Sequence, residues 1–265
     1  MTTVTRRKRE LFAALGLLAA VLAATACGGE GKGNTNGSAE PAEAPTTLPQ
    51  GSEPVDLDPA DFSIEIDNPY WPMSPGDRWV YDETDTEGTK ERVVVEVTDR
   101  TKKIANGIEA RVVRDTVSED GVPVEITDDW YAQDSDGNIW YLGEHVTNYV
   151  DGEAVDHEGS FEAGVDGAQA GIAMPSDPEP GLTYRQEYLK GEAEDKGAVI
   201  TVGEEQVEVP FGFFDQDVLM TRDLVPTEPK VEELKFYAPG VGLVLSMHTD
   251  GAGSRAVLVN FTPGP

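Results

Sequence analysis

From about residue 61 onward, apolar and polar side chains alternate with a period of two, and helical periodicity is almost absent. Val93, Val95 and Val97 alternate with polar residues, as expected for a strand with one buried face. Two-residue turn sequences separate such runs and favour tight hairpins. The pattern predicts an antiparallel meander whose turns are Asn106-Gly107, Asp120-Gly121 and Asp136-Gly137.

The C-terminal part repeats this pattern, which brings the total to about eleven or twelve sequential strands. A series of this length needs closure or strong curvature to protect its edges. We therefore predict a single all-β domain that forms a strongly curved antiparallel sheet or incomplete barrel, with a β-sandwich as the alternative. The predicted C-terminal strands are 183–188, 198–202, 207–209, 218–224, 231–237, 241–247 and 256–261.

A glycine-rich connection, residues 159–181, separates the two groups of strands and shows neither strand nor helix periodicity. Connections of this length inside a domain are usually functional lids or packed loops. Two interpretations stay open, a cover over a cavity and a structural plug or crossover.

The first 26 residues have the pattern of an export signal. Four basic residues at 6–9 precede an uncharged apolar run over 11–26, which is shorter than a membrane-spanning helix. Small residues then lead into Cys27, the only cysteine of the chain. This arrangement resembles the lipobox of bacterial lipoproteins, which implies cleavage before Cys27, lipid attachment to its thiol and a location on the outer side of the cell membrane.

Residues 27–60 combine Gly, Pro, Ala, Glu and Thr with few large apolar side chains. Such a composition buries too little apolar surface to offset the entropy of ordering. We therefore predict a signal peptide over 1–26, a disordered tether over 27–60 and a β domain over 61–265.

The formal net charge is −30, and removal of the first 26 residues changes it to about −33. A field of this sign repels nucleic acid and leaves basic envelope proteins, cations or neutral ligands as partners. Excess acid also simply keeps an exported domain soluble. A single cysteine excludes disulfides within the chain.

Five segments together resemble a group of uncharacterised exported proteins, largely actinobacterial lipoproteins. The resemblance implies an envelope location but no catalytic residues. Two of its pieces, PGDRWVY and VEVPFGFF followed by FYAPGVGLV, also resemble envelope proteins with a half-open β-barrel. The five segments are NPYWPMSPGDRWVY, DWYAQDSDGNIWYLGE, AGVDGAQAGIAMP, YRQEYLKGEAED and YAPGVGLV.

Aromatic residues flank the turn at 135–137. If Asp134 pairs with Asn138, then Tyr131 lies opposite Tyr141, and the tryptophans lie on the other face. Such pairs commonly just stabilise a hairpin, but aromatic groups also bind sugars or apolar ligands. The candidate ligand-binding residues are Trp130, Tyr131, Trp140, Tyr141, Phe161 and Met174.

The same turn offers a candidate calcium site in Asp134, Asp136 and Asn138, because oxygen ligands at alternate positions suit a hard cation. A three-residue hairpin loop with Gly137 in the left-handed conformation explains these residues without a metal. Apart from this calcium ion, the sequence implies no cofactor.

A second acidic group contains Glu187, Glu192, Glu194 and Asp195, close to Arg185. On a chain this acidic, we interpret it as a solvated turn, with a shared cation or an acid–base pair as the alternative. The three histidines lack zinc-site spacing, and we find no catalytic motif.

The sequence therefore predicts a non-enzymatic, membrane-anchored lipoprotein that binds an apolar or amphipathic ligand. Its alternatives are a structural or protein-interaction module of the cell envelope and a calcium-dependent binding or hydrolytic domain.

Overall fold

The structure is a computed structural model that describes residues 48–84, 88–226, 232–249 and 254–265. The predicted signal peptide, Cys27 and the tether up to residue 47 lie outside the described residues. Within the described ranges, no helix is long and apolar enough to cross a membrane.

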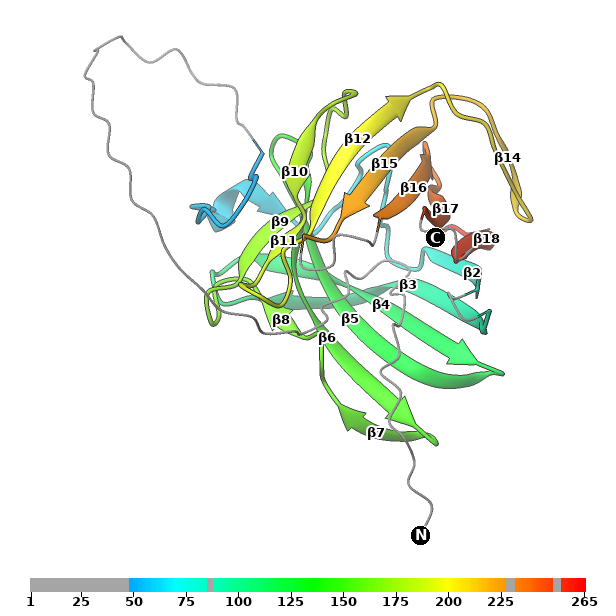
Figure 1. Cartoon of the computed structure of the whole chain (residues 1–265). Coiled ribbons are helices and arrows are strands. Elements are labelled where there is room, and N and C mark those ends of the chain that lie inside the picture. The colour runs from blue at the N-terminus through cyan, green and yellow to red at the C-terminus, as the bar shows by residue number, and fades with distance from the viewer. Residues whose placement is uncertain (1–47, 85–87, 227–231, 250–253) are drawn as a thin grey trace.

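Strands dominate the described chain (Figure 1). The one short 3-10 helix within these ranges is η1 (Pro59–Asp61). The strands are β1 (Phe62–Ser63), β2 (Arg78–Thr84), β3 (Lys90–Lys103), β4 (Glu109–Glu119), β5 (Val122–Asp134), β6 (Ile139–Val150), β7 (Glu153–Asp156), β8 (Phe161–Glu162), β9 (Gln169–Met174), β10 (Thr183–Arg185), β11 (Glu187–Tyr188), β12 (Lys196–Val202), β13 (Val207–Val209), β14 (Gly212–Phe214), β15 (Leu219–Leu224), β16 (Glu232–Ala238), β17 (Gly242–His248) and β18 (Arg255–Thr262).

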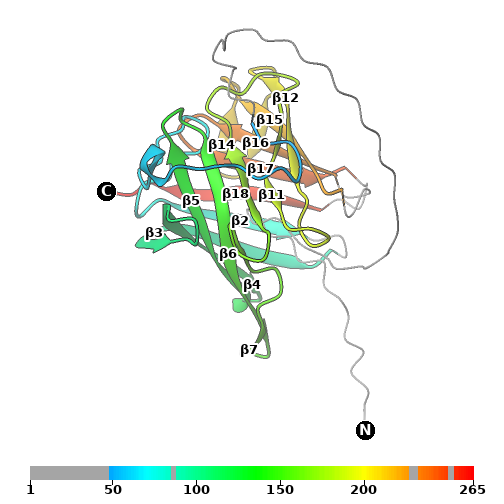
Figure 2. The ribbon, with the colours of Figure 1, turned by 90° about the vertical axis from the view of Figure 1, so that its left-hand side faces the viewer.

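The strands form one large antiparallel sheet that curls almost into a closed barrel, and β13 and β14 form a separate hairpin (Figures 1 and 2). The last strand, β18, pairs with β2 and so joins the two ends of the folded chain. The prediction of a strongly curved sheet or incomplete barrel is confirmed. The strand order is β10-β12-β15-β16-β17-β18-β2-β3-β4-β5-β6-β9-β11.

The predicted turns join neighbouring antiparallel strands. β4 and β5 are joined by Asp120 and Gly121, with φ of 49° and 80°, the left-handed values of a type I′ turn. Across the next turn, Tyr131 pairs with Tyr141 and Ala132 with Trp140, as predicted.

The glycine-rich segment 159–181 supplies two strands that its sequence did not predict. β8 pairs with β6, and β9 pairs with both β6 and β11. The segment therefore forms part of the barrel wall. Its glycines obscured the pattern because several of them serve turns, as at Gly164 and Gly167, whose φ values are 89° and 88°.

One short stretch, residues 183–188, closes the barrel. Its first part, β10, pairs with β12, and its second part, β11, pairs with β9 at the other end of the strand order. Gln186 lies between the two parts and donates its backbone N–H to the carbonyl of Asp195 at 2.8 Å. This stretch is the seam of the barrel.

Arg185 fixes the seam to the chain that precedes the barrel. Its side chain is 1% exposed and donates two hydrogen bonds to the carbonyl of Ala170, at 3.1 and 2.7 Å. The same guanidinium donates to the carbonyls of Gly51 and of Glu53, the latter at 2.7 Å. Ordered contacts therefore begin before the predicted domain start at residue 61.

Candidate functional site

Aromatic contacts across the barrel identify its inner face. Tyr131 lies on β5 and Tyr237 on β16, and these strands are not neighbours in the sheet. Both rings nevertheless contact Trp71, with ring centroids 5.5 and 6.0 Å apart. The face that carries Tyr131 and Tyr237 therefore points into the barrel.

The inner end around Trp71 is aromatic and apolar. Tyr131 stacks on Tyr141 at 5.1 Å, and Trp79 stacks on Phe261 at the same distance. The indole N–H of Trp79 donates a hydrogen bond to the backbone carbonyl of Val241 at 2.6 Å, so this buried donor is paired. This end resembles an ordinary hydrophobic core.

Further along the same strands, the inner face changes from aromatic to acidic. On β5, Tyr131 is followed by Asp129 and then Glu125, which are 1% and 7% exposed. On β16, Tyr237 is followed by Lys235, which is 6% exposed. Since alternate residues of a strand share a face, these charges point inward as the tyrosines do.

These charges join into a continuous group, which we call the acidic band. Its members come from β4, β5, β6, β11, β15, β16 and the turn before β12, and each influences the ionisation of the next. The acidic band comprises Asp115, Glu125, Asp129, Glu144, Glu187, Asp195, Asp223 and Glu233, with Lys235 among them.

Burial keeps several of these carboxyl groups from ionising at their usual pH. It raises the pKa of Asp129 to about 7, against a hydrogen bond from Tyr141 that favours the charged form. Burial and the neighbouring Asp223 raise the pKa of Asp195 to about 8. Burial also raises the pKa of Glu144, with Asp129 as the next cause. At neutral pH the band therefore holds protons that exposed carboxylates would have lost.

The ammonium of Lys235 neutralises one end of the band. Its Nζ lies 2.6 Å from Asp223 and 3.4 Å from Glu233, and the lysine and Asp223 side chains are almost fully buried. Burial alone would lower the pKa of Lys235, but the two carboxylates outweigh it and raise this pKa. Lys235 therefore stays charged and favours the ionised form of Asp223, although burial still raises the pKa of that carboxyl.

The other end of the band lacks such compensation among the described residues. The carboxyl group of Asp115 is 4% exposed, and burial raises its pKa despite a backbone hydrogen bond from Thr116. Glu187 and Asp195 interact with each other through a hydrogen bond that requires a proton on one of them. The buried amide oxygen of Gln186 also lacks a donor. This end of the band thus has buried acceptors that the described donors do not satisfy.

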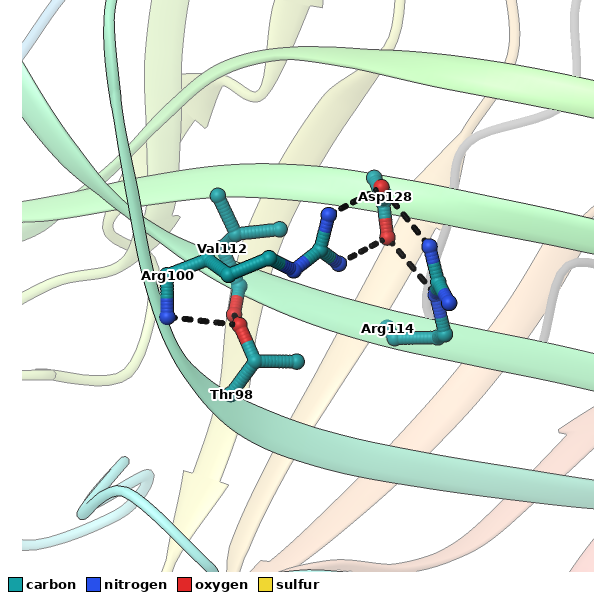
Figure 3. Close-up of polar contacts among 5 residues, drawn as sticks. All are labelled: Thr98, Arg100, Val112, Arg114 and Asp128. Carbon is teal, nitrogen blue, oxygen red and sulfur yellow. Dashed lines mark hydrogen bonds and ion pairs between the residues drawn. The ribbon is translucent and has the colours of Figure 1, made fainter.

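The opposite face of β5 shows how the same chain treats an acid on the outside. Asp128 accepts two hydrogen bonds from Arg100, at 2.8 and 2.6 Å, and two from Arg114, at 2.9 and 3.0 Å (Figure 3). Partial burial opposes ionisation, but the two guanidiniums outweigh it and lower the pKa of Asp128. Asp129, one residue later and inside, has no such arginine pair among its described contacts.

The predicted aromatic ligand residues divide between the two faces. Tyr131 and Tyr141 lie inside, and Phe161 contacts Tyr141 edge-on at 5.4 Å. Trp130 and Trp140 occupy the other face, where Lys102 lies 4.3 Å from the Trp130 ring centre and Phe62 packs on Trp140. The structure therefore does not gather the six predicted residues into one site. Met174 is fully buried in β9 opposite Ile139.

The candidate calcium ligands form a tight hairpin turn. The carboxylate of Asp134 accepts from the backbone N–H groups of Asp136 and Asn138 at 3.0 and 2.8 Å. Its second oxygen accepts from the Asn138 side chain at 2.9 Å and from Trp140 Nε1 at 2.7 Å. Gly137 has φ of 91°. Hydrogen bonds within the turn already occupy these oxygens, and no metal-binding group of three or more His, Cys, Asp or Glu occurs within the described ranges.

We expect Asp134→Ala to lower the melting temperature, because it leaves Trp140 Nε1 and two backbone N–H groups without their acceptor. One hydrogen bond to a charged group contributes about 1.5–3 kcal/mol, so the loss should be at least about 2–3 kcal/mol. Thermal unfolding by circular dichroism measures the change.

Calcium provides the matched test at the same turn. Since the Asp134 carboxylate already has its donors, adding calcium or a chelator should leave the melting temperature of the natural chain unchanged. A calcium-dependent rise that disappears in Asp136→Asn would instead support the calcium site.

The acidic group predicted as a solvated turn is divided by the fold. Glu192 is exposed and Glu194 is half-buried, but Glu187 and Asp195 are 1% and 0% exposed. The prediction of a solvated turn is therefore wrong for these two residues. Glu187 lies in β11 of the seam, and its backbone N–H and that of Gln186 point to the carbonyl of Asp195. Sequence spacing does not reveal this contact. The inward members of β4, β5, β15 and β16 were also missed, although Glu125, Thr127, Asp129 and Tyr131 show the alternation that places them together.

Fold and site together define an all-β barrel whose interior is aromatic at one end and acidic further along. No known family profile matches the sequence, and no curated protein matches it. The chain is similar to the crystal structure of a "putative lipoprotein" from Parabacteroides distasonis, with 16% identity and a TM-score of 0.38 over 73% of this chain and 98% of that one. A likeness at this level assigns neither a family nor a function to this chain.

Proposed function

We propose that this protein is an exported, lipid-anchored binding protein that holds an amphipathic ligand inside its barrel. The observation that carries the proposal is the change from aromatic to acidic side chains along the inner face. On β5 this change runs from Tyr131 to Asp129, and on β16 from Tyr237 to Lys235. An interior built only for stability gains more from apolar side chains than from buried carboxylates.

The proposed location at the cell membrane rests on the sequence before the described residues. A basic start, a short apolar run and small residues before Cys27 support export and attachment of a lipid to that thiol. The resemblance to exported actinobacterial lipoproteins supports the same location. A binding protein that its lipid anchors to the outer side of the cell membrane meets ligands that never enter the cytoplasm.

Mass spectrometry of protein extracted from its own membrane tests both the lipid anchor and the bound ligand. The mature N-terminal peptide should begin at Cys27 and carry the mass of a diacylglycerol. Under native conditions the whole protein should be heavier than the lipidated polypeptide, and denaturation of the same sample should release the difference. A native mass equal to that of the lipidated polypeptide would contradict ligand binding, and an unmodified N-terminus elsewhere would contradict the anchor.

A further inference from the structure

The acidic band has a surplus of hydrogen-bond acceptors that the fold does not use. Gln186 and Glu187 each have a buried oxygen without a donor, although Gln186 is no acid and adds nothing to the charge. Glu187 and Asp195 share one proton, and Asp195 also accepts a hydrogen bond from the backbone of Glu194. Leaving buried acceptors unpaired costs free energy, so the surplus indicates a group that is present when the protein works.

The missing group must bring donors and positive charge. Each unpaired atom in this part of the band is an oxygen that accepts, and its neighbours are carboxyls. The described cation of the band, Lys235, is already held by Asp223 and Glu233. A neutral hydroxyl head would supply one donor and no charge, and a carboxylate head would add to the repulsion.

The arrangement suits an ammonium group better than a metal ion. Calcium needs six to eight oxygens converging at about 2.3–2.6 Å, and no such cluster of acidic ligands occurs among the described residues. An ammonium carries three N–H donors that can reach separate acceptors on different strands. Glu187 and Asp195 are buried at the seam with carboxylate oxygens that lack a side-chain donor, and Asp129 on β5 lies close enough to raise the pKa of Glu187.

Aromatic rings next to the band favour an organic cation. The hydroxyl of Tyr141 donates to Asp129 at 2.9 Å, and Tyr131 stacks on the Tyr141 ring. The charged head therefore lies beside the aromatic end of the barrel. An alkyl chain attached to the ammonium would pack among these rings, and the ring faces attract the cation itself.

We infer that the polar head of the ligand is a primary ammonium on an alkyl chain, bound by Asp129, Glu187 and Asp195. This inference rests on the proposed function, because it specifies the ligand of the same interior. The ligand class is an amphipathic amine.

Three probes of equal chain length test the head group. We would measure thermal unfolding of the full lipidated chain in nanodiscs at pH 8.5 with hexylammonium, 1-hexanol or hexanoate. Hexylammonium should raise the melting temperature by about 3 °C or more at saturation, and the other two should not. The shift should shrink at pH 5.5, where the carboxyls of Asp129 and Asp195 are protonated.

Matched variants show which residues cause the rise in melting temperature with hexylammonium. Asp129→Asn and Glu187→Gln keep the side-chain shape and should each reduce the hexylammonium shift at least threefold. Glu153→Gln, on the exposed strand β7, is the control and should leave the shift unchanged. An equal loss in all three variants would mean that net charge alone attracts the amine, and would overturn the inference.

The remaining outcomes separate the inference from the proposed function. Equal shifts with hexanol or hexanoate would overturn the ammonium head and leave an amphipathic ligand in the barrel. A shift with calcium that Asp129→Asn abolishes would also overturn it, in favour of an inorganic cation. No shift with hexylammonium, while native mass spectrometry finds a bound ligand, refutes the amine alone. A bare native mass refutes both.

Discussion

Lys235→Met should destabilise the protein by about 3–5 kcal/mol at pH 8, which is the usual cost of removing one partner from a buried ion pair. Methionine matches the lysine stem in volume, so packing is largely kept. Asp223 and Glu233 lose the ammonium that lies 2.6 and 3.4 Å away. Their charges then add to a band that already lacks compensation. Urea unfolding followed by tryptophan fluorescence measures the change.

The loss should depend on pH in a defined direction. Burial raises the pKa of Asp223 even with Lys235 present, and without the lysine this pKa should rise further. A carboxyl whose pKa is raised by folding favours the folded state below the unfolded pKa, and loses that contribution as pH rises through the folded value. The destabilisation by Lys235→Met should therefore be smaller at pH 5.5 than at pH 8.

A second substitution provides the control for this prediction. In Lys235→Met combined with Asp223→Asn, the buried charge is removed together with its partner, and most of the lost stability should return at pH 8. An unchanged stability of Lys235→Met at pH 8 would show that water or protons already compensate Asp223.

Gly171→Ala should destabilise the protein by about 3 kcal/mol or more, because the new methyl group has no space at the seam. Its Cβ would overlap the backbone carbonyl of Gln186 and lie 2.6 Å from the carbonyl oxygen of Arg185. Both neighbours are backbone, so no side chain can rotate away. We expect the melting temperature to fall by about 6–12 °C for a domain of this size.

Gly212→Ala is the matched control. Gly212 also lacks a left-handed backbone, and the nearest atom to its added methyl group would be a Phe214 ring carbon at 3.8 Å. That substitution should change the melting temperature little. Hydrogen exchange should show that Gly171→Ala opens β9, β10 and β11 before the long strands β3 to β6. Uniform loss of protection would contradict a local role for the seam.

The period-two pattern predicted strands, turns and register well, because these depend on residues close in sequence. The pairing of Tyr131 with Tyr141 followed from a single turn assignment and is confirmed. The strong curvature of the sheet was predicted from the number of sequential strands alone. The same pattern says which residues share a face, but not which face is the inside.

That limit explains the missed site. Glu125, Thr127 and Asp129 are polar, as solvent-facing strand positions usually are, but they line the barrel because Tyr131 and Tyr237 meet Trp71 on that face. The seam was missed for a different reason. Glu187 and Asp195 are buried by contacts between the two ends of the strand order, and such contacts leave no trace in local spacing.

Arg185 has a mechanical consequence. The guanidinium that holds Gly51 and Glu53 belongs to the same stretch that closes the barrel. Tension applied to the chain at Leu48 would reach the barrel first at this arginine, rather than at β2, and would load the shortest strand pairs of the wall. The place where the preceding chain is held therefore coincides with the short strand pairs of the seam.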